Sequence, residues 1–213
     1  MNLNRLRQII QEEIHNITAD SFVTDKYIQH DILSSDSGER MFDEYKYESE
    51  TDIDMDFDEF MEDPSNEADF RNWLEYEMKY RFNEKKDLFD KLFSQGGGRI
   101  TLYRAMRVNK SWIKKLNKQN TKLGIYWSFE ENAAEAHWGY GRGNTEDVLI
   151  QTSVTEDQVD WEGTFYANLS PSTGEEEKEM RLKENENIQI EALWVNNKEI
   201  NLNKTIKSHI YLS

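Results

Sequence analysis

The chain has 213 residues, with 26 lysines and arginines against 42 aspartates and glutamates, so its formal net charge is −16. This balance argues against direct nucleic-acid binding and against docking on anionic membranes, because both need clustered cations. The absence of cysteine excludes disulfides, zinc–thiolate sites and thiol nucleophiles.

Residues 2–17 have apolar side chains at spacings of three and four, which predicts an amphipathic helix packed on the body of the protein. Charged side chains interrupt the apolar pattern, so this stretch does not resemble a signal peptide. No apolar run in the chain reaches the ~18 residues of a membrane span. We therefore expect a soluble, cytoplasmic protein.

Residues 31–70 hold 16 acidic and 2 basic side chains, and the rest of the chain is close to neutral. We interpret 31–66 as a solvated acidic surface or a flexible segment; imitation of a nucleic-acid backbone is the alternative. The stretch DIDMDFDEF places carboxylates at every second position, as a calcium loop does. A calcium site is disfavoured, because Phe57 stands where that loop needs glycine and Asp63 where it needs glutamate.

Residues 67–94 carry a helical stripe of large apolar side chains, and Gly96, Gly97 and Gly98 end the predicted helix. We interpret the glycines as a flexible connector rather than a phosphate loop, because no GxxxxGKS or GxxxxGKT sequence follows. The chain then divides into a helical N-terminal region, 1–95, and a second domain, 96–213.

The sequence of the second domain predicts short strands and helices in irregular order. Strands are expected at 99–108, 124–129, 147–154, 179–182, 187–195 and 205–212. The other segments are a short helix or turn at 110–117, a helix at 130–137 and a loop at 162–176. Strands do not alternate regularly with long helices, so the predicted fold class is α+β rather than a doubly wound sheet.

The stretch GEEEKEMRL, residues 174–182, is the most informative for chemistry. If the strand has begun by Glu177, then Glu177 and Glu179 project to the same face. Two close carboxylates suit acid–base work or stabilisation of a cation; the alternative is a solvated charge run at the entrance of a strand. The four histidines are scattered, without the spacing of a metal site.

Three features occur in a particular order between residues 99 and 196. An arginine lies in the first strand of this half, in LYRAM (Arg104). A glycine-led aromatic strand with a serine, GIYWSF (Ser128), precedes an alanine-rich helix, and Glu-x-Glu precedes a strand, in EKEMRL (Glu177 and Glu179). This order resembles the Arg–Ser–Glu pattern of the mono-ADP-ribosyltransferases, a family that includes arginine-modifying toxins and phage-encoded enzymes that modify host proteins.

The resemblance implies a core of two small packed β-sheets with a cleft for nicotinamide adenine dinucleotide (NAD) between them. It implies an enzyme that cleaves the nicotinamide–ribose bond of NAD and transfers ADP-ribose to a host protein, on arginine. Arg104 would bind the phosphates, because the guanidinium fork matches phosphate oxygens. Ser128 would bond near the nicotinamide ribose or orient Glu179, and one of three aromatic residues would stack on the nicotinamide: Tyr126, Trp127 or Phe129.

Glu179 would be the catalytic glutamate, which binds the ribose and stabilises the oxocarbenium-like transition state. Glu177 would position and deprotonate the acceptor arginine. The loop that ends at Glu176, with Phe165 and Tyr166 near its start, would recognise the acceptor.

The sequence departs from the family in its middle motif, where Trp127-Ser128-Phe129 stands in place of Ser-Thr-Ser. Two alternatives in register also remain open. Arg107 is a possible substitute for Arg104. The catalytic glutamate is one of four, Glu175, Glu176, Glu177 or Glu179.

NAD would be a substrate, and the chemistry requires no metal. The expected partner is a basic or nucleic-acid-associated host protein, since an acidic surface raises the rate of encounter with a basic one. A phage-encoded, toxin-like protein of this kind would act in the host cytoplasm, where the virion can deliver it. The alternatives are an NAD glycohydrolase of the same fold, a non-enzymatic acidic inhibitor that imitates nucleic acid, and a virion-associated protein.

Overall fold

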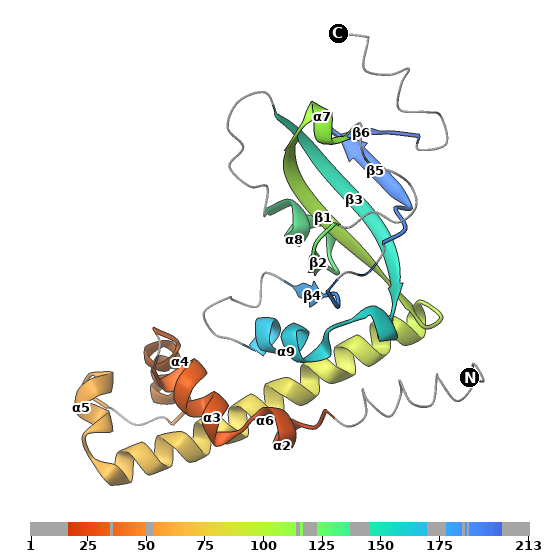
Figure 1. Ribbon diagram of the computed structural model, residues 1–213. Helices are drawn as coiled ribbons and strands as arrows, with labels where there is room; N and C mark the ends of the chain where they lie inside the picture. The colour runs from red at the N-terminus through yellow and green to blue at the C-terminus, as the bar shows by residue number, and fades with distance from the viewer. Residues whose placement is uncertain are drawn as a thin grey trace. The chain divides into compact units, whose positions relative to one another are not determined.

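The computed structural model describes residues 17–34, 36–49, 53–113, 116, 123–136, 145–169, 178–184, 186 and 188–201 (Figure 1). The strand predicted at 205–212 and all but the last residue of the helix predicted at 2–17 lie outside these residues. The chain forms two compact units: Met1–Phe89 with Phe165–Glu175, and Asp90–Thr164 with Glu176–Ser213. The sequence-based division at 95 and 96 stays a prediction, since these units are defined by spatial proximity.

The described part of the first unit is helical. Its elements are α2 (Ala19–Phe22), α3 (Asp25–Tyr27), one turn of π-helix η1 (Ile28–Leu33), α4 (Asp36–Glu48), α5 (Phe57–Met61) and α6 (Pro64–Gln95), which continues into the second unit. Side chains of Thr18, Thr24 and Asp56 accept hydrogen bonds from backbone N–H groups and so cap the starts of α2, α3 and α5.

Helices α4 and α5 cover much of the acidic segment 31–66. The carboxylates of α4 are exposed while Met41 and Phe42 are buried, so along α4 the segment is an ordered helix with a solvated acidic surface. Asp56 of the supposed calcium loop bonds the backbone N–H of Glu59 at 2.9 Å. Its carboxylate therefore caps a helix.

Aromatic rings fill the core of the first unit. Phe42 lies 4.7 Å from Phe60 and 5.8 Å from Phe70, measured between ring centroids, and Phe42 and Phe70 are fully buried. Further along α6, Phe82 stacks on Phe165 at 4.2 Å. The helix predicted at 67–94 is thus confirmed, and its apolar stripe supplies much of this core.

The second unit is built on one antiparallel sheet in the order β4-β2-β1-β3-β5-β6. The strands are β1 (Arg99–Asn109), β2 (Tyr126–Ser128), β3 (Thr145–Thr155), β4 (Glu179–Arg181), β5 (Ala192–Val195) and β6 (Lys198–Glu199). The fold class α+β is confirmed. The described strands form a single sheet, however, where the resemblance implied two small packed sheets.

The helices that lie wholly within the second unit are short. They are α7 (Lys110–Ile113), α8 (Glu131–Ala136), which packs on β1, and the 3₁₀ turn η2 (Glu156–Gln158). The glycine connector is a tight turn, with φ of +65° at Gly97 and +85° at Gly98. Residues with a Cβ rarely adopt such angles, so the glycines end α6 and reverse the chain into β1.

Two predictions in this half are wrong. The loop expected at 162–176 begins as helix α9 (Trp161–Leu169), and Phe165 is buried rather than free for recognition. The carboxylate of Asp160 accepts a hydrogen bond from the Gly163 N–H at 3.1 Å and so caps α9. The strand expected at 187–195 is shorter than predicted and covers β5 alone.

No helix within the described part of the chain combines the length and the apolar character that a membrane crossing requires.

Candidate functional site

Strand register brings the three motifs of the sequence together. Within the second unit, β2 lies between β1 and β4. The Cα atom of Ser128 is paired with that of Tyr103 on one side and with that of Glu179 on the other. Arg104 follows Tyr103 directly. The arginine, serine and glutamate motifs therefore occupy three neighbouring strands, although they are far apart in the sequence.

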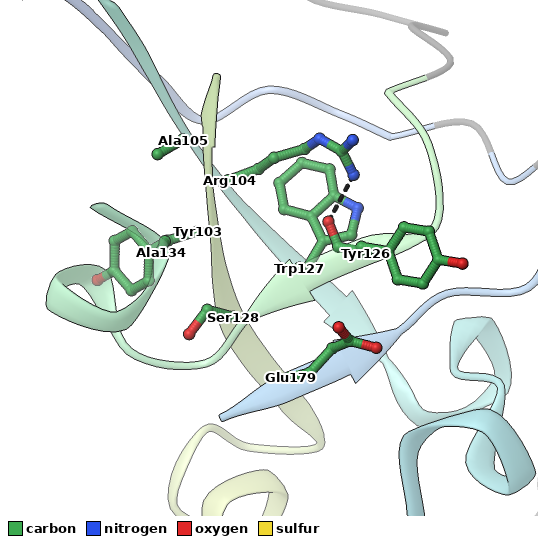
Figure 2. Close-up of a pocket in the computed structure, with 8 residues that line it drawn as sticks. All are labelled: Tyr103, Arg104, Ala105, Tyr126, Trp127, Ser128, Ala134 and Glu179. Atoms are coloured by element: carbon green, nitrogen blue, oxygen red, sulfur yellow. Dashed lines mark hydrogen bonds between the residues drawn. The ribbon is translucent and has the colours of Figure 1, made fainter. Parts of the chain in front are cut away.

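A pocket of about 270 Å³ lies at this place (Figure 2). It is lined by five of the predicted site residues, Arg104, Tyr126, Trp127, Ser128 and Glu179, together with Tyr103, Ala105 and Ala134. Phe129 does not line it. Glu177, Glu175 and Glu176 lie outside the described residues, so the role predicted for Glu177 stays a prediction.

Arg104 is a largely buried cation with little to balance its charge. Its Nη1 donates to the backbone carbonyl of Tyr126, and its Cζ lies 6.0 Å from the ring centroid of Trp127. Its Nε is buried without a hydrogen-bond partner, and no carboxylate of the described residues forms an ion pair with it. Burial lowers the pKa of this guanidinium. Such a group favours an anionic ligand.

The glycine of GIYWSF has a steric role beside Arg104. Gly124 has a φ of +86°, and a Cβ built on it would lie 3.1 Å from both Nη1 and Nη2 of Arg104. The missing side chain thus lets the guanidinium reach the carbonyl of Tyr126.

Arg107, the alternative arginine, differs in both position and partner. Its Nε donates to Asp147 Oδ1 at 2.6 Å in a partly exposed ion pair, and this hydrogen bond raises its pKa. It does not line the pocket. These observations favour Arg104 as the arginine of the site.

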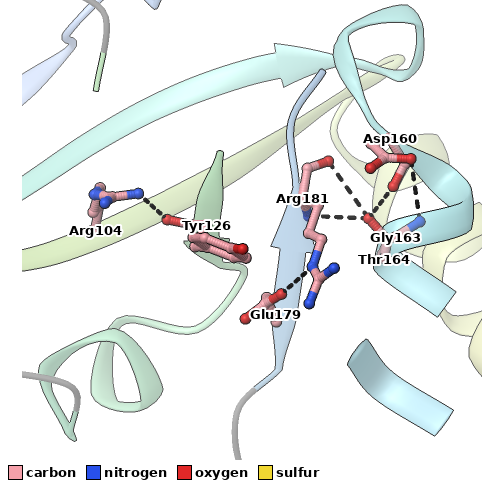
Figure 3. A network of polar contacts seen from close by, with 7 residues as sticks. All are labelled: Arg104, Tyr126, Asp160, Gly163, Thr164, Glu179 and Arg181. Carbon is pink, nitrogen blue, oxygen red and sulfur yellow. Dashed lines mark hydrogen bonds and ion pairs between the residues drawn. The ribbon is translucent and has the colours of Figure 1, made fainter. Parts of the chain in front are cut away.

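Glu179 is held by a neighbouring arginine (Figure 3). The Nε of Arg181 donates to Glu179 Oε1 at 2.6 Å, and both side chains are mostly buried, with exposed fractions of 25% and 17%. The Cζ of Arg181 lies 5.1 Å from the ring centroid of Tyr126. Glu179 and Arg181 alternate along β4 with buried Met180, so both project from the same face of the sheet.

Ser128 serves the chain turn before α8. Its hydroxyl donates to the Glu130 carbonyl at 2.8 Å and accepts from the Glu130 N–H at 3.1 Å. The Glu179 carboxylate accepts a hydrogen bond from Arg181. Both roles predicted for Ser128, near a bound ribose and in orienting Glu179, stay predictions.

The aromatic residues of the motif have different environments. Trp127 is buried, and its Nε1 donates to the Gly124 carbonyl at 3.0 Å. The side chain of Tyr126 is 51% exposed, which makes it the better stacking surface for a ligand ring. Tyr103, on the neighbouring strand, was not predicted; burial and then the Glu131 carboxylate raise its pKa.

Arg181 was also missed, although a signal was present in the sequence. In the strand EMR, residue 181 is two positions after Glu179 and therefore on the same face. The described residues contain no group of three or more acidic or histidine side chains that could hold a metal ion. No protein-family model, no curated protein and no solved structure matches this chain.

Proposed function

We propose that this chain is a mono-ADP-ribosyltransferase that uses NAD as a substrate and modifies arginine on a host protein. The observation that carries the proposal is the shared pocket: Arg104 without a carboxylate partner among the described residues and Glu179 come from different strands and line the same cavity. The order of the motifs along the chain and their place on three adjacent strands support it.

Arg104 would bind the phosphates of the dinucleotide. A guanidinium offers planar N–H donors that match phosphate oxygens. The guanidinium of Arg104 is largely buried, so little solvent surrounds its positive charge, and a bound anion would balance that charge. The pocket, about 270 Å³ in volume, is at the small end for ligand sites, so it suits one nucleoside-sized part of NAD. Tyr126 would stack on the nicotinamide or on a base.

Glu179 would supply the negative charge for bond cleavage. As the C1′–N bond breaks, its electron pair leaves with nicotinamide, and positive charge develops on the ribose ring. A fixed carboxylate beside that ring stabilises the oxocarbenium-like transition state. A terminal nitrogen of the acceptor arginine then bonds to C1′ and loses a proton, for which the resemblance assigns Glu177.

The second unit would thus be an ADP-ribosyltransferase-like core, in which the six-stranded sheet replaces the expected pair of small sheets. The acidic surface of α4 and α5 would favour encounter with a basic host protein in the host cytoplasm.

The test is incubation of the purified chain with NAD labelled in its adenylate part and a bacterial lysate. We expect labelled protein bands with the wild type, bands at least ~100-fold weaker with Glu179→Gln, and unchanged bands with the matched control Glu184→Gln, whose side chain is exposed beyond β4.

Free nicotinamide without labelled macromolecules would indicate the glycohydrolase instead. Absence of both turnover and NAD binding would overturn the enzyme proposal. Loss of function on neutralising the acids of α4 would then favour the non-enzymatic inhibitor.

A further inference from the structure

We propose that Arg181 is a positioning residue, which orients the Glu179 carboxylate in the pocket by the hydrogen bond from its Nε. This inference rests on the proposed function, and it gives to an arginine on β4 the orienting role that the resemblance gave to a serine on β2. The 2.6 Å bond between Nε and Oε1 is the contact from which it starts.

The backbone of Arg181 is fixed on both sides. Its N–H donates to Thr164 Oγ1 at 3.0 Å (Figure 3). Its carbonyl accepts from the Asp160 N–H at 2.8 Å. Thr164 Oγ1 in turn donates to the Asp160 carbonyl at 2.7 Å. The first turn of α9 therefore locks the position from which the Arg181 side chain departs.

The side chain of Arg181 is also confined. A Cβ at Gly163 would lie 2.5 Å from Asp160 Oδ2 and 2.8 Å from Arg181 Cδ, so the aliphatic stem of Arg181 packs closely against a residue that has no side chain. The guanidinium then lies against the ring of Tyr126, with Cζ 5.1 Å from the ring centroid. Stem and guanidinium are thus each held by a different element.

A confined Nε–H donor can fix the orientation of a carboxylate, which a mobile cation cannot do. The terminal torsion of a glutamate has broad wells, so an isolated carboxylate samples many orientations. A single N–H donor on a fixed stem selects one of them. Lysine lacks an Nε–H donor and carries its charge at the end of a flexible chain, so it should not replace arginine here.

A positioning role predicts a particular kinetic pattern. The turnover number, kcat, should fall about tenfold to a hundredfold in Arg181→Gln and in Arg181→Lys, because a misplaced catalytic group is costly. KM for NAD should change by less than about threefold, since Arg181 is not among the residues that line the pocket. Added ethylguanidine should restore part of the activity of Arg181→Ala.

The experiment measures kcat and KM for NAD cleavage by the wild type, the Arg181 variants and the control Arg99→Gln, which removes an exposed arginine from β1 of the same sheet. Gly163→Ala is the second variant, because it keeps the Arg181 charge but displaces its stem together with the Asp160 carboxylate. A rise in KM at constant kcat, or activity of Arg181→Gln equal to that of Arg99→Gln, would overturn the positioning role alone. Wild-type protein without NAD turnover would overturn the proposed function first, and this inference with it.

Discussion

The substitution Gly124→Ala separates two contributions of one glycine. In the structure Gly124 has a φ of +86°, which favours glycine, and its missing side chain leaves room for both terminal nitrogens of Arg104. Alanine would strain the backbone and would place its Cβ 3.1 Å from each of these nitrogens. The guanidinium would have to move, and the hydrogen bond to the Tyr126 carbonyl would be lost or distorted.

The two contributions have different sizes and different controls. A left-handed backbone angle costs about 1–2 kcal/mol for a residue with a Cβ, which lowers Tm by about 2–8 °C. Gly98 is the matched control for this backbone cost, because its φ is +85° and a Cβ there would meet nothing within 4 Å. Gly98→Ala should therefore lower Tm by that amount alone, without moving Arg104, and Gly124→Ala should lower it further.

Binding of NAD should distinguish the two variants. A hydrogen bond from a charged donor to a bound phosphate is worth about 1.5–3 kcal/mol, so displacement of the Arg104 guanidinium in Gly124→Ala should weaken NAD binding by about tenfold to a hundredfold. Gly98→Ala should bind NAD as the wild type does. The measurements are thermal unfolding followed by calorimetry and isothermal titration with NAD. Equal NAD affinity in the two variants would refute the reasoning that Gly124 exists to admit the Arg104 guanidinium.

Three further outcomes follow from the contacts described above. Arg104→Met should abolish NAD binding yet raise Tm by about 2–4 °C, because a buried cation without a carboxylate partner among the described residues is removed; a lower Tm would contradict this. Phe70→Ala should lower the free energy of unfolding by about 3–5 kcal/mol in a urea titration, because the ring is fully buried. Hydrogen bonds from Lys79 to Asp20 and then to Glu75 raise the pKa of Lys79 to about 12. The stabilisation by these ion pairs should therefore persist at neutral pH and fade only as the pH rises through 12. An NMR titration of the Lys79 side chain checks this value, and titration near its usual pKa would disprove it.

Secondary structure was predictable wherever the hydrophobic pattern was strong. The stripe on 67–94 became α6, the alternation in 99–108 became β1, and the apolar stretch in 147–154 became β3; β1 and β3 are the two long strands of the sheet. In β3 the successive residues Val148, Leu149 and Ile150 are all buried, so this strand buries apolar side chains on both of its faces.

The helix α9 was missed because its composition is typical of a loop. Gly163 and its polar neighbours suggested a turn, but Asp160 caps the helix and Phe165 anchors it by stacking on Phe82. The same reason applies to the acidic segment, where charge suggested flexibility. Burial of Met41 and Phe42 outweighs that charge, because the carboxylates remain in solvent.

The members of the site were predictable, but their contacts were not. The motifs predicted Arg104, Ser128 and Glu179 as site residues, and the strand register of the sheet places them on adjacent strands. The hydrogen bonds of Ser128 to Glu130 and the ion pair of Arg181 depend on the turn before α8 and on the first turn of α9. The three motifs carry no information about the conformation of these two turns, so these contacts could not be predicted from the motifs.

The strand that carries Glu179 has a second consequence, for the solution behaviour of the protein. In the described part of the sheet, β4 and β6 are the outermost strands; both are short and both carry a pair of opposite charges, in EMR and in KE. Short, charged outer strands resist pairing with other molecules, which protects a protein from aggregation. Apolar substitutions at Glu179 or Arg181 would remove this protection together with the chemistry. Glutamine is therefore the safer replacement at both positions, because it keeps the outer strand polar. A loss of activity can then be distinguished from a loss of solubility.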